Sequence, residues 1–183
     1  MQSDTLQPPD SVDLLTILVA PHPSLKTKAR EVGPDDADAV RALVPRMFET
    51  MYRAPGIGLA APQVGSRLRL AVVDLVPSER REPLVLINPR LVLTSTELAT
   101  REEGCLSLPN QYAEVTRPAE IRVQFHDQAG TRHELHADGL LAACLQHEID
   151  HLDGVLFTDY LSTLKRNMIL RRLAKEQKMK ASS

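Results

Sequence analysis

The chain has 183 residues, of which 43% are hydrophobic and 25% charged, and its formal net charge is −2. This length allows a single domain, residues 1–183, with a sizeable core, and the balanced charge argues against DNA binding by the whole chain. Two cysteines are too few for a disulfide framework, no apolar run is long enough to span a membrane, and the acidic leading residues match neither a secretion signal nor a transit peptide. We therefore expect a cytoplasmic protein.

Apolar spacing predicts a helix near the amino terminus, after a loose polar lead at residues 1–13. From about Pro34 to Tyr52 the apolar residues recur three and four positions apart, and Asp35 stands near the predicted start. Pro45 is predicted to kink this helix or to divide it into two pieces, because its ring displaces a backbone hydrogen bond.

Residues 56–63, with the sequence GIGLAAPQ, are predicted to form a loop pressed against a ligand. Glycines let the backbone approach a bound molecule closely, and the amide of Gln63 could donate a hydrogen bond to a developing oxyanion. The segment is not a phosphate-binding loop, because it lacks the lysine and hydroxyl of that motif and precedes an apolar strand expected at residues 68–75. The alternative is an ordinary glycine-rich turn.

Further strands are predicted at residues 84–93 and 121–125, and a turn at 127–130 leads to a hairpin partner at 132–136. The charged residues 77–83 are predicted to be an exposed insertion. The histidines of the hairpin are predicted to lie on the strand surface and not to form a second metal site: His126, His133 and His136.

The pattern H-E-x-x-H begins at His147, and on a helix it places two imidazoles on one face with a carboxylate beside them. His147 and His151 could hold one metal ion while Glu148 moves protons on a bound water. Asp138 can cap the start of such a helix, and Gly154 can end it. The alternative is a solvated helix face, since short patterns also arise by chance.

A third metal ligand decides the class of site. A third histidine three residues after Gly154, as in one class of zinc proteases, is excluded because Phe157 stands there. A later glutamate is a poor source, because beyond Asp159 the only acidic residue is Glu176, in a basic tail. Cys105 is the best candidate, and three protein ligands with an open position are typical of catalytic zinc sites. The alternative for Cys105 is a small buried hydrophobe.

Three motifs occur in the order GIGLAAPQ, EGCLS and QHEIDH, and together they resemble the peptide deformylase family. Each motif is weak alone, but their order and separation are jointly specific, and the resemblance extends from Ile17 to the last helix. The resemblance implies one divalent metal ion bound by three residues: Cys105, His147 and His151. It also implies that Glu148 is the general base and acid, and that Gln63 and the backbone amide of Leu106 stabilise the oxyanion.

The reaction implied by this resemblance is hydrolysis of the N-formyl group from the initiator formyl-methionine of nascent polypeptides, with release of formate. Water activated by the metal attacks the formyl carbon, and Glu148 accepts a proton and then delivers it to the departing amine. The implied ion is Fe²⁺ in vivo, whereas Zn²⁺, Ni²⁺ or Co²⁺ could occupy the site in purified protein.

Specificity for methionine requires an apolar slot beside the metal. Ile57, Leu140 and Cys144 are the candidates, since Leu140 and Cys144 continue the helix face of the metal-binding histidines. The alternative is that these residues are ordinary core. Beyond methionine, the resemblance implies that an extended substrate pairs with backbone near Gly58 and Gly104 as an added strand.

The C-terminal stretch, residues 159–183, is predicted to be an amphipathic helix and tail. Its predicted apolar side is Leu161, Leu164, Met168 and Leu173. Its basic residues favour an anionic partner such as ribosomal RNA, and the resemblance implies that this helix reaches the ribosome: Lys165, Arg166, Arg171, Arg172, Lys175, Lys178 and Lys180. The alternative is a solvated helix face.

The order of strands and helices predicts an α+β fold. The resemblance adds antiparallel or mixed sheets that surround a central metal-binding helix, with one helix near each end of the chain. We also expect a monomer. Two other functions are weighed against deformylation. One is a zinc endopeptidase, which Phe157 disfavours, and the other is a noncatalytic ribosome-binding module, which Glu148 and the open metal position disfavour.

Overall fold

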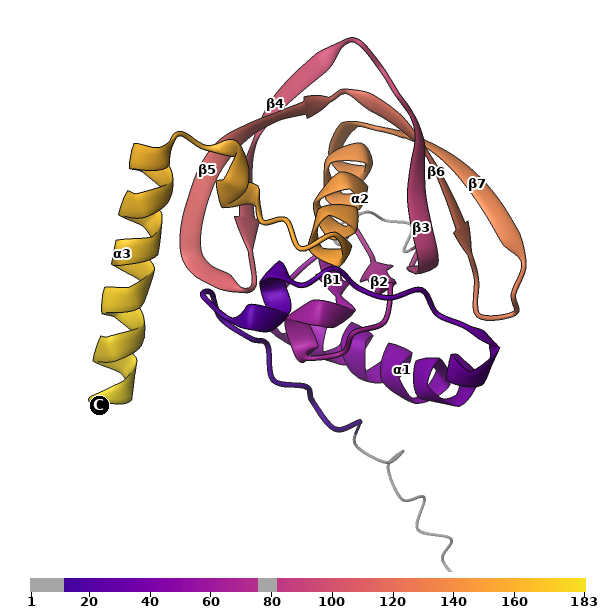
Figure 1. Ribbon diagram of the computed structural model, residues 1–183, viewed down its shortest axis with the longest axis horizontal. Helices are drawn as coiled ribbons and strands as arrows, with labels where there is room; N and C mark the ends of the chain where they lie inside the picture. The colour runs from indigo at the N-terminus through magenta and orange to yellow at the C-terminus, as the bar shows by residue number, and fades with distance from the viewer. Residues whose placement is uncertain (1–11, 76–81) are drawn as a thin grey trace, which may run out of the picture.

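The computed structural model describes residues 12–75 and 82–183. Most of the predicted polar lead at residues 1–13 and of the predicted insertion at residues 77–83 therefore lies outside the described residues. The predicted α+β class is confirmed (Figure 1). The described α-helices are α1 (Ala37–Arg53), α2 (Gly139–Leu152) and α3 (Thr163–Ala181). The described strands are β1 (Gly58–Ala60), β2 (Leu70–Val73), β3 (Leu84–Thr94), β4 (Leu98–Cys105), β5 (Leu108–Pro118), β6 (Glu120–His126) and β7 (Arg132–Asp138).

The strands form two antiparallel sheets around α2. One sheet has the order β1-β2-β3-β6-β7, and the other is the hairpin β4-β5. In Figure 1, α2 stands in the centre, with β5 on one side and β3 on the other. The predicted central helix surrounded by sheets is thus confirmed. None of the helices in the described ranges is long and apolar enough to cross a bilayer.

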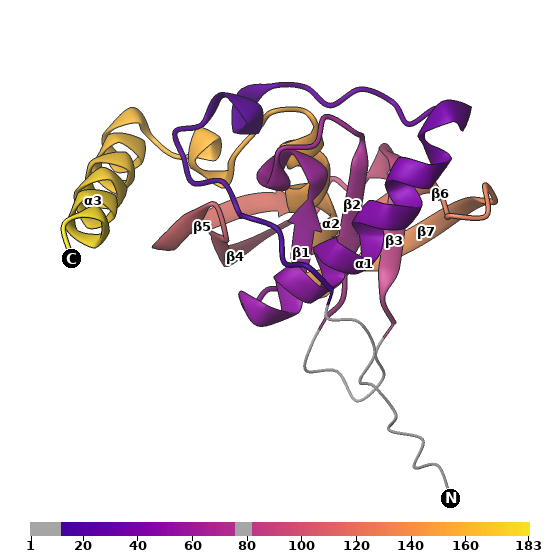
Figure 2. The same ribbon diagram turned by 90° about the horizontal axis from the view of Figure 1, so that it is seen from below.

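Helices α1 and α2 cover opposite faces of the larger sheet (Figure 2). Alternation along β2 explains this, since successive side chains of a strand point to opposite faces. Leu70 and Val72 pack in the cluster with α1, whereas Ala71 and Val73 pack in the cluster with α2. Every residue of β2 is therefore buried, which accounts for its uninterrupted apolar sequence.

Pro45 lies inside α1 without dividing it. The helix runs continuously from Ala37 to Arg53, so the alternative of two shorter pieces was wrong. Pro45 is exposed, and the carbonyl that lacks its usual helical donor belongs to Arg41, which is also exposed. Water can donate a hydrogen bond to that carbonyl. The opposite face of α1 packs on the sheet through four residues: Val40, Val44, Met47 and Met51.

Residues 56–63, which were predicted to form a loop, contain the short strand β1. Gly58 lies opposite Val73 in an antiparallel pair, and the 3₁₀-helix η3 (Ala61–Val64) follows. A three-residue strand is too short to show alternation, so its pairing depends on β2 rather than on its own sequence. The hairpin β4-β5 was not predicted either, because charged residues in both strands obscure the apolar pattern.

The C-terminal helix begins later than residue 159. Residues Phe157–Tyr160 form the 3₁₀-helix η4, and Ser162 then caps α3 by accepting a hydrogen bond from the Lys165 backbone N–H. The predicted apolar side was partly wrong. Ile169 and Leu173 are the buried residues of α3, whereas Leu164 and Met168 are exposed, because the helix packs on β5 along one narrow side only.

Candidate metal centre

Three potential metal ligands meet at the inner face of α2. His147 and His151 lie one helical turn apart, and their Nε2 atoms are 3.1 Å from each other. Cys105, at the end of β4, places its Sγ 3.2 Å from Nε2 of His151. Among the residues that the structure describes, this is the one group of three or more His, Cys, Asp or Glu side chains found close enough to hold an ion. The hairpin histidines are instead exposed, as predicted: His126, His133 and His136.

The donor set fits a divalent transition metal. Two atoms bound to one ion at about 2.0 Å for nitrogen and about 2.3 Å for sulfur must lie within about 4.5 Å of each other, as the closest pairs here do. Burial lowers the pKa of His151 well below its usual value, and the charges of His147 and Arg117 act in the same direction. The His151 imidazole is therefore neutral, which is the form that binds a metal. Burial alone would lower the pKa of His147, but its hydrogen bonds with Cys105 and Glu103 raise it well above its usual value, so His147 must release a proton when it binds an ion.

Glu148 lies beside the three donors and is almost completely buried, at 3% exposure. Its Oε2 has no hydrogen-bond partner among the described residues, so it can accept a bond from a molecule in the site. Burial raises the pKa of Glu148 to about 7, with the positive charge of His147 opposing the rise and the charge of Glu103 adding to it. A carboxyl group with such a pKa can both take and return a proton near neutral pH.

Gln63 is held with its NH₂ group toward the donors. Its Oε1 accepts a hydrogen bond from the Ala60 backbone N–H at 2.9 Å, which fixes which end of the amide is oxygen. Its Nε2 donates to Ser107 Oγ at 3.1 Å and lies 3.5 Å from Cys105 Sγ. The side chain thus places its NH₂ group at the edge of the site, beside Cys105.

A cleft of about 630 Å³ opens beside these groups. Its lining includes all of the predicted site residues except His151, which is almost completely buried. Burial raises the pKa of Cys144 well above its usual value, so this thiol stays neutral and forms an apolar part of the cleft surface. The predicted residues that line the cleft are Ile57, Gly58, Gln63, Gly104, Cys105, Leu106, Leu140, Cys144, His147 and Glu148.

A buried ion-pair network, which was not predicted from the sequence, contacts Nδ1 of His147. Glu103 Oε1 lies 3.0 Å from Nδ1 of His147, and both Glu103 oxygens accept hydrogen bonds from Arg117, at 2.6 and 2.9 Å. Burial alone would raise the pKa of Glu103, but the hydrogen bonds from Arg117 and His147 lower it to about 2. The carboxylate is therefore ionised, and such an outer partner fixes the orientation of a metal-binding imidazole.

One signal in the sequence could have indicated Glu103. It lies two residues before Cys105, so in a strand both side chains point to the same face. Arg117 gave no such signal, because its contact with Glu103 depends on the register of β4 with β5.

The sequence and the fold both match a known family. The family model for polypeptide deformylase matches residues 14–167. The chain belongs to this family. A peptide deformylase of Rhizobium meliloti is 51% identical over 167 residues, which cover 91% of this chain and 95% of that protein. A peptide deformylase of Zymomonas mobilis is 50% identical over 175 residues, which cover 93% of this chain and 98% of that protein.

Solved deformylase structures share the fold. The crystal structure of a peptide deformylase from Legionella pneumophila is 43% identical, with a TM-score of 0.87, and the match covers 93% of this chain and 99% of that one. A peptide deformylase from Ehrlichia chaffeensis, crystallised in complex with actinonin, is 39% identical with a TM-score of 0.84, covering 89% and 97% of the two chains. The protein is accordingly a hydrolase of the metal-dependent deformylase family, and the endopeptidase and noncatalytic interpretations lose their support.

Proposed function

We propose that this deformylase removes the N-formyl group from the initiator formyl-methionine of nascent polypeptides, and that Cys105, His147 and His151 hold its metal ion. The observation that carries the proposal is the meeting of one thiol and two imidazoles, at one cleft, with a buried carboxylate oxygen of Glu148 that has no hydrogen-bond partner among the described residues. Three protein donors leave a coordination position open, as catalytic sites require.

Fe²⁺ is the proposed ion in vivo, because the family resemblance implies it and the donor set of one thiolate and two imidazoles accepts it. Zn²⁺, Ni²⁺ or Co²⁺ would suit the same donors, and oxidation of a ferrous thiolate centre would favour such ions in protein purified in air. When bound, a divalent ion supplies Lewis acidity, which lowers the pKa of water and polarises a carbonyl oxygen.

Glu148 is the proposed base and acid of the reaction. Its carboxylate accepts a proton from the attacking water and later returns it to the amine that leaves when the C–N bond breaks. Negative charge collects on the formyl oxygen during attack. The Gln63 Nε2–H and the Leu106 backbone N–H are the proposed donors to this oxygen, and the bond from Ala60 to Gln63 Oε1 supports that role by holding the amide in place.

Ile57, Leu140 and Cys144 are the proposed slot for the methionine side chain. All three line the cleft, together with His147 and Glu148 of α2. The following residues of the substrate would lie extended along Gly58 and Gly104. Both positions lack a Cβ and lie at the cleft, which supports pairing of a peptide backbone with β1 and β4.

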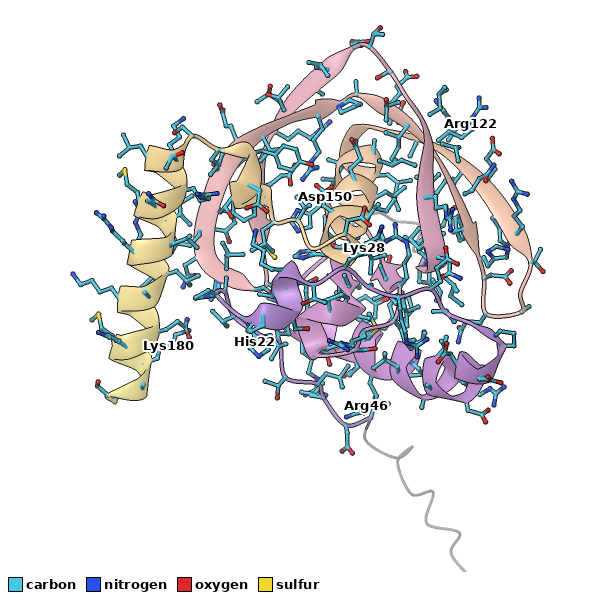
Figure 3. The ribbon with its side chains drawn as sticks, in the orientation of Figure 1. His22, Lys28, Arg46, Arg122, Asp150 and Lys180 are labelled. Carbon is cyan, nitrogen blue, oxygen red and sulfur yellow. The ribbon has the colours of Figure 1, made fainter. Side chains whose placement is uncertain are left out.

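The basic residues of α3 are the proposed contact with ribosomes, from a monomeric, cytoplasmic protein. Lys165, Arg171, Arg172, Lys175, Lys178 and Lys180 are exposed, and Arg166 is half-buried. Helix α3 flanks the hairpin β4-β5 at one side of the molecule (Figure 1), and Figure 3 labels Lys180 near its carboxyl end. An exposed basic helix suits the phosphate backbone of ribosomal RNA.

Formate release from formyl-Met-Ala-Ser under anaerobic conditions tests the proposal. Metal-loaded wild-type protein should release formate, and Glu148→Ala should bind metal normally but release none. Cys105→Ser should separately lose metal affinity or change its preferred ion. No formate from the loaded wild type, or full release by Glu148→Ala, would contradict the mechanism. Cleavage at an internal peptide bond would favour an endopeptidase.

A further inference from the structure

Tyr160 ends η4, the short helix that connects the metal-binding helix to α3, and it is outside the cleft described above. Half of its surface is exposed, so the ring is not needed to fill the core. Its hydroxyl nevertheless donates a 2.7 Å hydrogen bond to Oδ2 of Asp150, the residue immediately before His151 on α2. The face of the ring lies against Arg117, whose Cζ is 4.7 Å from the ring centroid.

Arg117 is shared between two carboxylates. Its Nε and Nη2 donate to Glu103, and its Nη1 donates to Asp150 Oδ2 at 2.8 Å. Only 5% of its side chain is exposed. The guanidinium is planar and its donors are rigidly arranged, so a shift toward Asp150 must weaken its alignment with Glu103.

The Tyr160 hydroxyl and Arg117 Nη1 donate to the same oxygen of Asp150. The hydroxyl therefore satisfies part of the hydrogen-bonding capacity of this carboxylate, which Arg117 would otherwise have to meet alone. The face of the Tyr160 ring adds a cation–π contact with the Arg117 guanidinium, which further restricts its movement. Both contacts favour the position in which Arg117 aligns Glu103 with Nδ1 of His147.

We propose that Tyr160 is a positioning residue of the metal centre, which acts through Asp150 and Arg117 to keep Glu103 aligned with His147. The proposal rests on the proposed metal ligands. It assigns a function to a side chain that touches neither the donors nor the cleft. It also predicts that the hydroxyl and the ring contribute separately, because they make different contacts with the network.

Co²⁺ binding to the purified protein tests this proposal without reference to turnover. The dissociation constant is measured by competition with a chromophoric chelator, and the visible spectrum of the Co²⁺ protein reports the geometry of its ligands. Direct outer-shell partners typically contribute about 10- to 100-fold to metal affinity. Since Tyr160 is further out, Tyr160→Phe should weaken Co²⁺ binding about 3- to 10-fold and shift the spectral bands, and Tyr160→Leu should weaken it more.

Asp159→Asn is the matched control. Asp159 lies beside Tyr160 in η4, where it pairs with Lys26 and accepts a bond from the Leu156 backbone N–H, and it has no hydrogen bond to Asp150 or Arg117 in the described structure. This variant should lower the melting temperature without changing Co²⁺ affinity or the spectrum. An Asp150→Ala background should abolish most of the effect of Tyr160→Phe, because the hydroxyl acts through that carboxylate and alanine leaves it no acceptor.

Wild-type affinity and an unchanged spectrum in both Tyr160 variants would overturn the proposal. Equal loss of affinity in Asp159→Asn would also overturn it, since general loosening of η4 would then explain the effect. The metal site itself is tested separately. If wild-type protein binds no Co²⁺, or Cys105→Ser binds it with an unchanged spectrum, the proposed ligands fail and Tyr160 loses its role with them.

Discussion

Gly58 on β1 faces Glu148 on α2 so closely that a Cβ at position 58 would lie 2.5 Å from Glu148 Oε1. Such a Cβ would also lie 2.9 Å from the carboxyl carbon and 3.0 Å from Cγ, so the whole end of the side chain would have to move. Because Glu148 is buried, it has little room to do so. The absence of a side chain at position 58 therefore sets the position of the proposed base.

Gly58→Ala should consequently reduce the rate of deformylation and spare metal binding. Displacement of a reacting group by about 1 Å can cost about 100-fold in rate, so we expect kcat to fall about 10- to 100-fold. The measurement is kcat for a formyl peptide together with metal content per protein chain. Gly33→Ala is the control, since among the described residues a Cβ there meets only Asp36 Oδ2, at 3.8 Å. Unchanged kcat in Gly58→Ala would show that Glu148 is not held by this contact.

Gly154→Ala should destabilise the protein more than Gly130→Ala. Both glycines have a positive φ, at +75° and +82°, which costs an alanine about 1–2 kcal/mol. At position 154 a Cβ would also lie 2.6 Å from the Lys26 backbone oxygen, whereas at position 130 it would have no described neighbour within 4 Å. Urea unfolding of the two variants measures the difference. Equal losses of stability would mean that the backbone near Lys26 moves without cost.

Reversal of exposed charges on α3 tests ribosome binding better than truncation after Leu164. Truncation would remove Ile169 and Leu173, which pack in a core cluster with Phe157. The triple substitution of Arg171, Arg172 and Lys175 by glutamate leaves that packing intact. We expect ribosome co-sedimentation to weaken by about tenfold or more, since each lost phosphate contact lowers affinity, with unchanged cleavage of a short formyl peptide.

A second charge-reversed protein serves as the control for that experiment. Lys28→Glu, Arg67→Glu and Arg132→Glu together reverse the same number of charges at three exposed residues that lie outside α3. This protein should sediment with ribosomes like the wild type. Equal weakening in both proteins would point to net charge rather than to a specific role of α3.

The Tyr160 phenol should ionise at unusually high pH. Burial raises its pKa to about 12, the hydrogen bond and charge of Asp150 add to the rise, and Arg117 opposes it. The folded protein favours the neutral phenol, so the stability that Tyr160 contributes is fully present below the ordinary pKa of about 10. That contribution is lost as the pH rises through about 12. The difference in phenolate absorbance between wild type and Tyr160→Phe should have its midpoint near pH 12; a midpoint at the ordinary pKa would contradict the hydrogen bond.

The parts of the site that the sequence predicts well are those set by local spacing. His147, Glu148 and His151 lie within two turns of one helix, so their arrangement follows from the helical repeat alone. Cys105 and Gln63 lie far from these three residues in the chain. Both were predicted from the chemistry of their side chains and from the resemblance of their motifs to a known family. Arg117 could not be found in this way, because its two carboxylate partners come together only when β4, β5 and α2 have packed.

In the fold, too, some features follow from local spacing and others only from tertiary packing. The buried face of α1 follows from its own spacing, whereas the buried face of α3 does not. Leu164 and Met168 fit a helical apolar face as well as Ile169 and Leu173 do, and only the place where β5 meets the helix decides between them. Strand β1 is likewise decided by its partner β2.

The cluster between the larger sheet and α2 contains several alanines: Ala60, Ala71, Ala137 and Ala142. A helix can pack closer to a sheet when the side chains between them are alanine than when they are leucine. These four residues therefore set the distance between α2 and the strands. Enlargement of any one would lift the helix and carry both histidines away from Cys105, which sits on the other sheet. The spacing of the proposed metal ligands is therefore controlled by methyl groups that lie outside the proposed site.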